Sequence, residues 1–415
     1  MTSLSHWGSE LKVLEDSTQL LIMMVQNNHR CHLVVECPEF WDLCSKISEN
    51  VYPYSTLPLS VKQNISTALV HAGSANMNQY KDKYWQQTLQ PLHHRYHNLT
   101  THPTFTQHKH KESTILELSS ILSMLQGISA ASTPSNTTYL FGFLTNFLPD
   151  CPKLIDIYHG NESLVVLILE LYVEVVHKQI CYLKQTQCSL LCDWTMNLLK
   201  SYSNHGNTMT SSEDDITLII ELLTNLLSKD FIDFSEPDAD ETWSIPGAQP
   251  METSAADVVL FGLGIILPNM NSQLLLYPEL CSQYFKLITF LCEIYPEKIE
   301  KLSDEMLQSF VYSLQIGLKS YGCDNCKLCL EAIESLSTHC YKTKDAPSSL
   351  HNVVSSFTKV IDSQQDEQTK LRLSTSFANL THDVSLLNHD RNSRTTFLRN
   401  LESIIYNIRG ILCVK

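Results

Sequence analysis

The apolar residues of this sequence recur with the period of an α-helix over long stretches. In Leu164–Val176 the only charged side chains, Glu170 and Glu174, are four residues apart and share one helix face, and all other residues are apolar. Ile216–Leu227 follows a similar pattern. Helices of this kind are buried on nearly all sides. The pattern therefore predicts an all-α protein built of closely packed helices.

Turn-forming residues are scarce. The 415 residues include 12 Gly and 15 Pro, below the averages of about 7% and about 5%. A β-sheet protein needs a turn about every 8–12 residues, so the composition favours helices joined by short connections. Hydrophobic residues make up 43% of the chain, which is enough for a large core.

Gly and Pro separate about sixteen expected helices. Grouped in antiparallel pairs, the helices give units of roughly 40–45 residues, the length of a HEAT repeat. The units are Phe40–His71, Tyr80–Gln126, Tyr139–His177, Leu183–Leu227, Ala255–Ile294, Asp304–Thr338 and Leu350–Leu380. Because about sixteen helices cannot share one core, an α-solenoid is favoured over a non-repetitive bundle. We expect one superhelix of HEAT-type antiparallel helix pairs over residues 1–415.

Two segments interrupt the helical pattern. Residues 98–111 are polar and His-rich, and they are predicted to form a loop between helices. Residues 230–254 form an acidic and Pro-rich insertion. Between Ser211 and Glu241 there are ten acids and one Lys, which account for −9 of the net charge of −15. Loops longer than about 12–15 residues are uncommon in compact arrays and are often functional.

The acidic insertion is the best candidate for a functional site. Its acids would attract a basic partner, and Phe231, Phe234 and Trp243 would supply contact area. The same aromatic residues are equally compatible with a loop that docks back onto the array, and a solvated loop without a partner remains a further alternative. The predicted partner-binding residues are Glu221, Asp230, Phe231, Asp233, Phe234, Glu236, Asp238, Asp240 and Glu241.

Two other clusters resemble metal sites but lack essential features of one. Cys323, Cys326 and Cys329 are spaced by three, and a helix would place them along one stripe with no loop to complete the ligand shell. His93 and His97 are four residues apart, but an arginine lies between them and the Glu of a HExxH motif is absent. No nucleophile elbow or phosphate-binding Gly-rich loop is present. We therefore expect no metal, no cofactor and no enzymatic activity.

The charge and the N-terminal sequence limit the class of protein further. The 29 Lys and Arg against 44 Asp and Glu argue against a nucleic-acid-binding surface and favour basic partners. Met1–Asp16 has no signal-peptide pattern, and no stretch is apolar enough to span a membrane. We therefore expect a reducing compartment, in which most of the 14 Cys are buried free thiols.

Several longer strings resemble the exportin-4 group of the importin-β (karyopherin-β) family of nuclear transport receptors. The strings are Val176–Leu183, Glu221–Ser235, Ser254–Leu260, Gln283–Ile299 and Gly410–Lys415. They occur in the family's order, and the resemblance covers Leu57–Lys415. It implies a HEAT superhelix that carries protein cargo through the nuclear pore with the small GTPase Ran in its GTP form. It also implies binding to Phe-Gly nucleoporins in grooves between outer helices, and shuttling between nucleus and cytoplasm.

Receptors of this family are far longer than 415 residues, and the main Ran-binding surface lies in their N-terminal repeats. We therefore expect this chain to correspond to the C-terminal part of such a receptor. The alternative is a HEAT-repeat scaffold that mediates protein–protein interactions without Ran-dependent transport.

Overall fold

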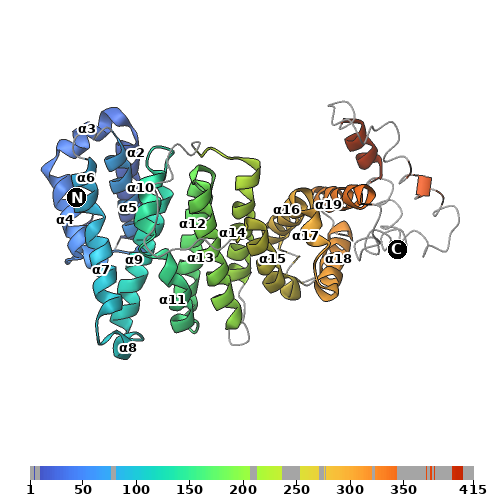
Figure 1. Cartoon of the computed structure of the whole chain (residues 1–415). Helices are drawn as coiled ribbons and strands as arrows, with labels where there is room; N and C mark the ends of the chain where they lie inside the picture. Colours follow the sequence, from blue (N-terminus) through green and yellow to red (C-terminus); the bar gives the residue numbers. More distant parts are fainter. Residues whose placement is uncertain are drawn as a thin grey trace. The chain divides into compact units, whose positions relative to one another are not determined.

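The computed structural model describes residues 4, 10–75, 81–205, 213–235, 253–270, 275, 277–319, 323–343, 371, 374–375, 378 and 395–404. Throughout these residues the regular structure is helical and contains no strand, as Figure 1 shows. The predicted all-α fold of packed helices is confirmed. The chain divides into two compact units, Met1–Val258 and Val259–Lys415, which are described separately.

The first unit contains a series of long helices separated by shorter ones. Its helices are α2 (Leu11–Gln26), α3 (Asn28–Glu36), α4 (Pro38–Glu49), η1 (Tyr54–Thr56), α5 (Leu59–Ser74), α6 (Lys81–Thr88), α7 (Gln90–Thr101), α8 (Phe105–His108), α9 (Glu112–Ala130), α10 (Thr137–Leu144), η2 (Leu148–Asp150), α11 (Cys151–Tyr158), α12 (Glu162–Gln179), η3 (Ile180–Tyr182), α13 (Gln185–Asn204) and α14 (Glu213–Phe231). Helix α15 (Ala255–Ile266) begins in this unit and continues into the second.

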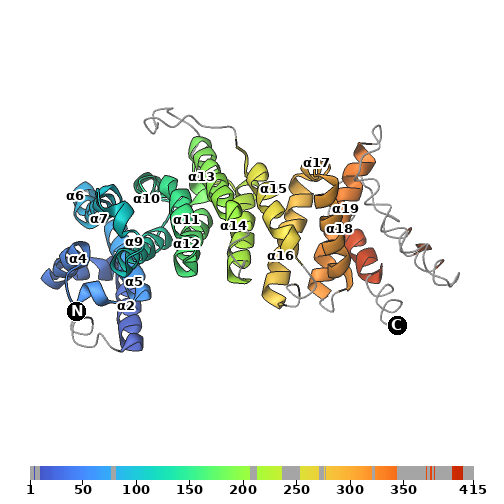
Figure 2. The same cartoon turned by 90° about the horizontal axis from the view of Figure 1, so that it is seen from below.

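One layer of this unit is formed by helices that follow one another in chain order. Helices α2, α5, α9, α12 and α14 pack side by side, each against the next (Figures 1 and 2). In the other layer, α4 contacts α6 and α7, and α11 contacts α13. Each repeating unit thus adds one helix to the first layer, which is the arrangement of a helical-repeat protein.

The observed repeat is longer than the predicted one. Helices α5, α9, α12 and α14 begin at residues 59, 112, 162 and 213, at intervals of 53, 50 and 51 residues. The expected interval of roughly 40–45 residues is too short because it rests on plain helix pairs. Short helices such as α8 and α10 lengthen the connections between the long ones.

The α5–α9 contact brings two backbones close together. A Cβ atom at Gly127 would overlap the carbonyl oxygen of Gln63. The Thr67 hydroxyl donates to the Gly127 carbonyl oxygen at 2.9 Å. Only a residue without a Cβ allows this approach, so Gly127 sets the spacing of the two helices.

Polar side chains also join neighbouring helices of the first layer. The Gln126 amide on α9 donates to the Leu167 carbonyl oxygen at 3.0 Å and to the Glu170 carboxylate at 3.1 Å. Burial raises the pKa of Glu170, and the hydrogen bond from Gln126 partly opposes that shift. One of the two acids in the apolar run of α12 therefore has a specific partner on the next helix.

The His-rich segment 98–111 is not the single loop that the sequence predicts. Its first residues, Asn98–Thr101, form the last turn of α7, and α8 occupies Phe105–His108. Helix α7 ends before Pro103 because a proline disfavours the helical conformation of the preceding residue, His102, which is extended. The polar composition of this segment therefore gave no indication of the last turn of α7 or of the short helix α8.

The second unit is built around α16 (Pro278–Ile294) and α19 (Cys323–Lys342), which pack together, with α17 (Pro296–Ile299), α18 (Asp304–Lys319) and η4 (Leu267–Asn269) beside them. Cys326 and Leu330 of α19 form a hydrophobic cluster with Leu401. Cys329 is also buried. The two thiols are thus packed in helix interfaces, as the helical interpretation of the Cys323–Cys329 spacing predicts.

Two negative findings apply to the described residues. Among them, no group of three or more His, Cys, Asp or Glu side chains is placed to hold a metal ion. No helix in that part of the chain is long and apolar enough to cross a membrane. The predicted helical unit Leu350–Leu380 lies outside the described residues, except for four positions. A single array over residues 1–415 stays a prediction.

Candidate functional site

The predicted acidic insertion, residues 230–254, begins inside a helix. Helix α14 continues to Phe231, and the Ile232 N–H still donates to the Ser228 carbonyl oxygen at 2.9 Å. Residues 232–235 then leave the helix. Asp230 and Asp233 lie at and just beyond the C-terminal end of α14. Because the helix dipole disfavours negative charge at that end, these two acids favour termination of the helix here. Residues 229–235 are called the α14 turn below.

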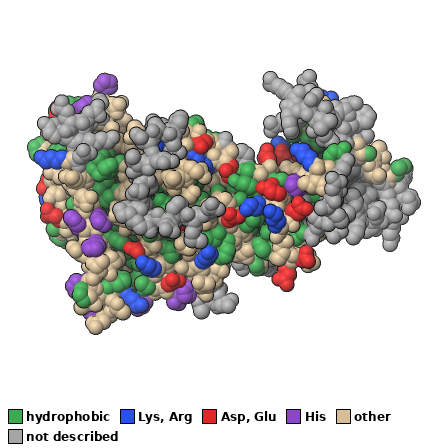
Figure 3. Space-filling view, viewed as in Figure 1, with side chains coloured by type: hydrophobic (Ala, Val, Ile, Leu, Met, Phe, Trp, Pro, Cys, Tyr) green, Lys and Arg blue, Asp and Glu red, His purple; other side chains and the backbone are tan. Residues whose placement is uncertain are grey.

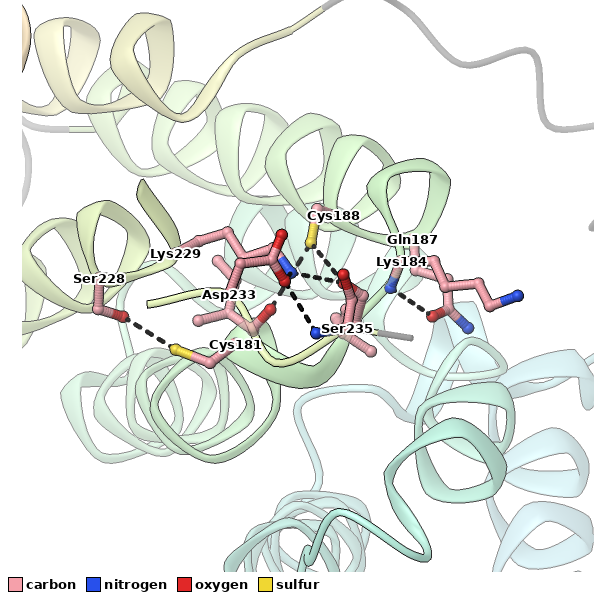
Figure 4. A network of polar contacts seen from close by, with 10 residues as sticks. Cys181, Lys184, Gln187, Cys188, Ser228, Lys229, Asp233 and Ser235 are labelled. Atoms are coloured by element: carbon pink, nitrogen blue, oxygen red, sulfur yellow. Dashed lines mark hydrogen bonds and ion pairs between the residues drawn. The ribbon is translucent and has the colours of Figure 1, made fainter. Parts of the chain in front are cut away.

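The α14 turn docks onto the residues that follow α12. The Phe234 N–H donates to the Cys181 carbonyl oxygen at 2.8 Å. Its ring stacks on Tyr182, with centroids 5.6 Å apart and planes inclined by 22°. The Ser228 hydroxyl lies 3.7 Å from the Cys181 sulfur (Figure 4). Residues 180–184, which receive these contacts, are called the η3 segment.

An ion pair fixes the shape of the α14 turn. The Lys229 ammonium binds the Asp233 carboxylate at 2.5 Å and the Leu183 carbonyl oxygen at 2.8 Å (Figure 4). The Ser235 N–H donates to the same carboxylate at 2.8 Å. The hydrogen bonds from Lys229 and Ser235 lower the pKa of Asp233 to about 2. Asp233 is therefore ionised at neutral pH and already engaged within the chain.

The η3 segment is itself held in place from α13. The buried Cys188 thiol donates to the Leu183 carbonyl oxygen at 3.5 Å and to the Ile180 carbonyl oxygen at 3.7 Å. The Lys184 N–H donates to the Gln187 side-chain oxygen at 3.1 Å at the start of α13. Burial raises the pKa of Cys188 to about 12. This thiol is thus a protonated packing group, and it supports the surface on which the α14 turn lies.

The structure does not bring all predicted partner-binding residues together. Glu221 is half-buried and nine residues before Asp230 on α14, about 13 Å away along the helix axis. Glu221 lies close enough to α12 to influence the pKa of Glu174. Burial raises the pKa of Glu174, and the positive charges of Lys178 and His177 oppose this shift. The negative charge of Glu221 raises the same pKa further. Glu221 therefore belongs to the contact between α12 and α14, away from the α14 turn.

Some of the remaining predicted residues are among the described residues, and four of them are not. Asp230 is exposed, and Phe234 is 61% exposed despite its stacking on Tyr182. Ile232, which the sequence analysis did not select, is 47% exposed beside them. Phe231 is the last residue of α14. The other four acids, Glu236, Asp238, Asp240 and Glu241, lie outside the described residues.

Two contact residues of the α14 turn were missed by the sequence analysis. Lys229 precedes Asp233 by four residues, a spacing that is readable as a helical ion pair. Tyr182 has no such signal, because it lies 52 residues before Phe234 in the chain. On the face drawn in Figure 3, acidic and basic side chains of described residues are intermixed. The exposed side chains of the α14 turn include the Asp230 carboxylate and the apolar groups of Ile232 and Phe234.

Comparison with known proteins identifies the family. A family model described as Exportin-4 matches residues 1–364, well over half of the chain. The chain belongs to the exportin-4 family. Exportin-4 of Dictyostelium discoideum is 20% identical over 473 aligned positions, which cover 100% of this chain and 40% of that protein. The chain therefore spans less than half the length of this exportin-4 relative.

The family match differs in extent from the resemblance found in the sequence. It includes residues 1–56, which the sequence strings do not cover, and it leaves out Gly410–Lys415. The exportin-4 relative is a longer protein than this chain, and nuclear transport by this chain is therefore a proposal. That the chain corresponds to the C-terminal part of an exportin-4 stays a prediction.

Proposed function

We propose that this chain is part of a nuclear transport receptor that binds protein cargo and Ran-GTP and shuttles between nucleus and cytoplasm. The observation that carries the proposal is the exportin-4 family match over residues 1–364. The layered helices of Met1–Val258 are consistent with it. Each helix contacts its neighbours in chain order, so small rotations can accumulate when a partner binds. Phe-Gly nucleoporins are the third class of partner in the proposal.

The α14 turn is the proposed contact surface for a basic cargo or for a basic face of Ran. Asp230 supplies charge, while Ile232 and Phe234 supply exposed apolar area. Acids increase the rate of encounter with a basic partner, and aromatic groups contribute most of the contact energy. Asp233 has a different role, because its carboxylate shapes the turn through Lys229.

The nucleotide dependence of Ran binding tests the transport proposal. The 415-residue protein, immobilised, is incubated with Ran loaded with a non-hydrolysable GTP analogue, and Ran loaded with GDP is the matched control. The proposal predicts retention of the GTP form only. Equal retention of both forms, or retention of neither, would contradict Ran-dependent transport by this chain.

A scaffold without a Ran-dependent role is the second candidate. The observation in its favour is the layer of helices packed in chain order within Met1–Val258, because such an array offers an extended surface to protein partners without requiring Ran. Capture of a basic protein partner without any response to Ran and its nucleotide would favour the scaffold. Release or recruitment of the partner by Ran-GTP would favour the receptor.

A further inference from the structure

Ser235 is the last residue of the α14 turn, outside regular secondary structure and partly exposed. Its N–H donates to the Asp233 carboxylate at 2.8 Å, and its hydroxyl interacts with the same carboxylate. The preceding residue, Phe234, makes the backbone hydrogen bond to Cys181. Ser235 is thus next to the residue that docks the turn and is bound to the carboxylate that shapes it.

The sequence after Ser235 is strongly acidic. Glu236, Asp238, Asp240 and Glu241 follow at the first, third, fifth and sixth positions. Acidophilic serine kinases recognise a non-helical serine through acids on its C-terminal side, which pair with basic side chains of the kinase. We propose that Ser235 is a phosphorylation site for a kinase of this class and that its phosphorylation releases the α14 turn from the η3 segment.

The reaction transfers a phosphoryl group from ATP without oxidation or reduction. The Ser235 hydroxyl oxygen forms a bond to the γ-phosphorus as the bond from that phosphorus to the oxygen of the departing ADP breaks. The hydroxyl proton passes to a base of the kinase. The product carries a charge of about −1.5 to −2 at neutral pH.

The new charge conflicts with the contacts that hold the turn. It stands two residues from the Asp233 carboxylate, and like charges at this separation repel strongly. Lys229 has one ammonium group, which already binds Asp233 and the Leu183 carbonyl oxygen. The phosphate competes for that ammonium and for the Ser235 N–H. Phe234 is the residue between Asp233 and phosphorylated Ser235 in the chain. As these two negative charges move apart, the contacts of Phe234 with the η3 segment are lost.

The test treats the 415-residue protein with ATP and a purified acidophilic serine kinase of the casein-kinase type. Ser211 and Ser212 also precede acids, so the assay uses an S211A/S212A background. Fragmentation mass spectrometry locates the phosphate, and hydrogen–deuterium exchange follows the segment that contains Phe234. We expect a phosphate on Ser235 and roughly tenfold faster exchange at Phe234, whereas S235A treated in the same way stays unchanged.

Two controls test the basis of recognition. E236Q/D238N removes acids without touching the described contacts, and we expect several-fold slower modification of Ser235. Ser254 has an acid at its third following position, Asp257, but its hydroxyl donates to that carboxylate at 2.7 Å at the start of α15. We expect Ser254 to be modified more slowly than Ser235.

Three results would overturn the proposal. They are the absence of phosphate on Ser235, equal modification of E236Q/D238N, and exchange at Phe234 that is unchanged or slower after modification. None of these readouts involves Ran or cargo. Failure of the phosphorylation proposal is thus distinct from failure of the transport proposal.

Discussion

The α5–α9 interface and the α14 turn show two ways in which this chain holds its parts together. At Gly127 the backbones of α5 and α9 approach so closely that no Cβ fits, and the surrounding apolar residues are buried. At the α14 turn, Phe234 is 61% exposed, and the side chain of Asp233 is 54% exposed. Its contacts with the η3 segment and within the turn include the backbone hydrogen bond from Phe234 to Cys181, the hydrogen bonds from Lys229 and Ser235, and one stacked ring pair. The closely packed helix layer thus stabilises this part of the chain, whereas the α14 turn is the proposed recognition surface.

The largest effect is expected at Gly127. Gly127→Ala places a Cβ against the Gln63 carbonyl oxygen, and a backbone atom cannot move aside as a flexible side chain does. We expect a loss of about 3 kcal/mol in the free energy of unfolding, measured in urea. Gly142→Ala on α10 is the matched control, because its Cβ meets nothing within 4 Å. That variant should be unchanged or stabilised by up to about 1 kcal/mol. Equal stability of the two variants would contradict the close approach of α5 and α9.

The second-largest loss of stability is expected at a partly buried ion pair. The Arg95 guanidinium on α7 binds Glu117 on α9 at 2.8 Å, and the Asn50 amide donates to the other Glu117 oxygen at 2.7 Å. Glu117→Gln leaves the Arg95 charge unpaired, and we expect a loss of about 2 kcal/mol in thermal or urea unfolding. The exposed pair of Lys46 and Asp42 provides the control. Asp42→Asn should change stability by less than about 1 kcal/mol. A larger effect for Asp42→Asn than for Glu117→Gln would refute this ranking.

A local effect without a large change in global stability is expected for Asp233. Its pKa is lowered to about 2 in the folded chain, below the ordinary value of 3.8. A depressed carboxyl pKa stabilises the folded contact above the ordinary pKa, and the stabilisation is lost as pH falls toward the folded value. We therefore expect the α14 turn to undock between about pH 4 and pH 2. Asp233→Asn should reproduce this release at pH 7.

Hydrogen exchange at the Phe234 amide measures this release, because that amide donates to Cys181. Exchange should be faster in Asp233→Asn than in the parent protein at pH 7. Asp230→Asn is the matched control three residues earlier, on the exposed end of α14. Equal acceleration in both variants would show that overall negative charge, rather than the ion pair with Lys229, keeps the turn in place.

The difference between the two regions also explains what the sequence can predict. The apolar run Leu164–Val176 identifies α12 because helical periodicity is a local property. The succession of helices separated by Gly and Pro is likewise a local pattern. The same holds for the sequence strings that resemble the exportin-4 family. The observed 50–53-residue repeat was not predicted, because short helices such as α8 and α10 span too few residues to show a period.

For the candidate site, local composition suggested where a partner would bind but gave no information on how the residues are arranged. The acids and aromatics of the insertion drew attention to Asp230, Asp233 and Phe234. The docking of Phe234 on Cys181 and Tyr182 joins residues more than fifty positions apart, and no local pattern encodes such a contact. Glu221 was grouped with these residues by charge alone, whereas the register of α14 places it toward α12.

Phe234→Ala tests most directly whether recognition and stability are separate in this chain. The measurement pairs the midpoint of thermal unfolding with the affinity for Ran-GTP or for a basic protein partner. Phe234 is mostly exposed, so we expect the midpoint to change by less than about 2 °C, while affinity falls about tenfold. An unchanged affinity, or a fall in the midpoint as large as that of Gly127→Ala, would contradict the separation.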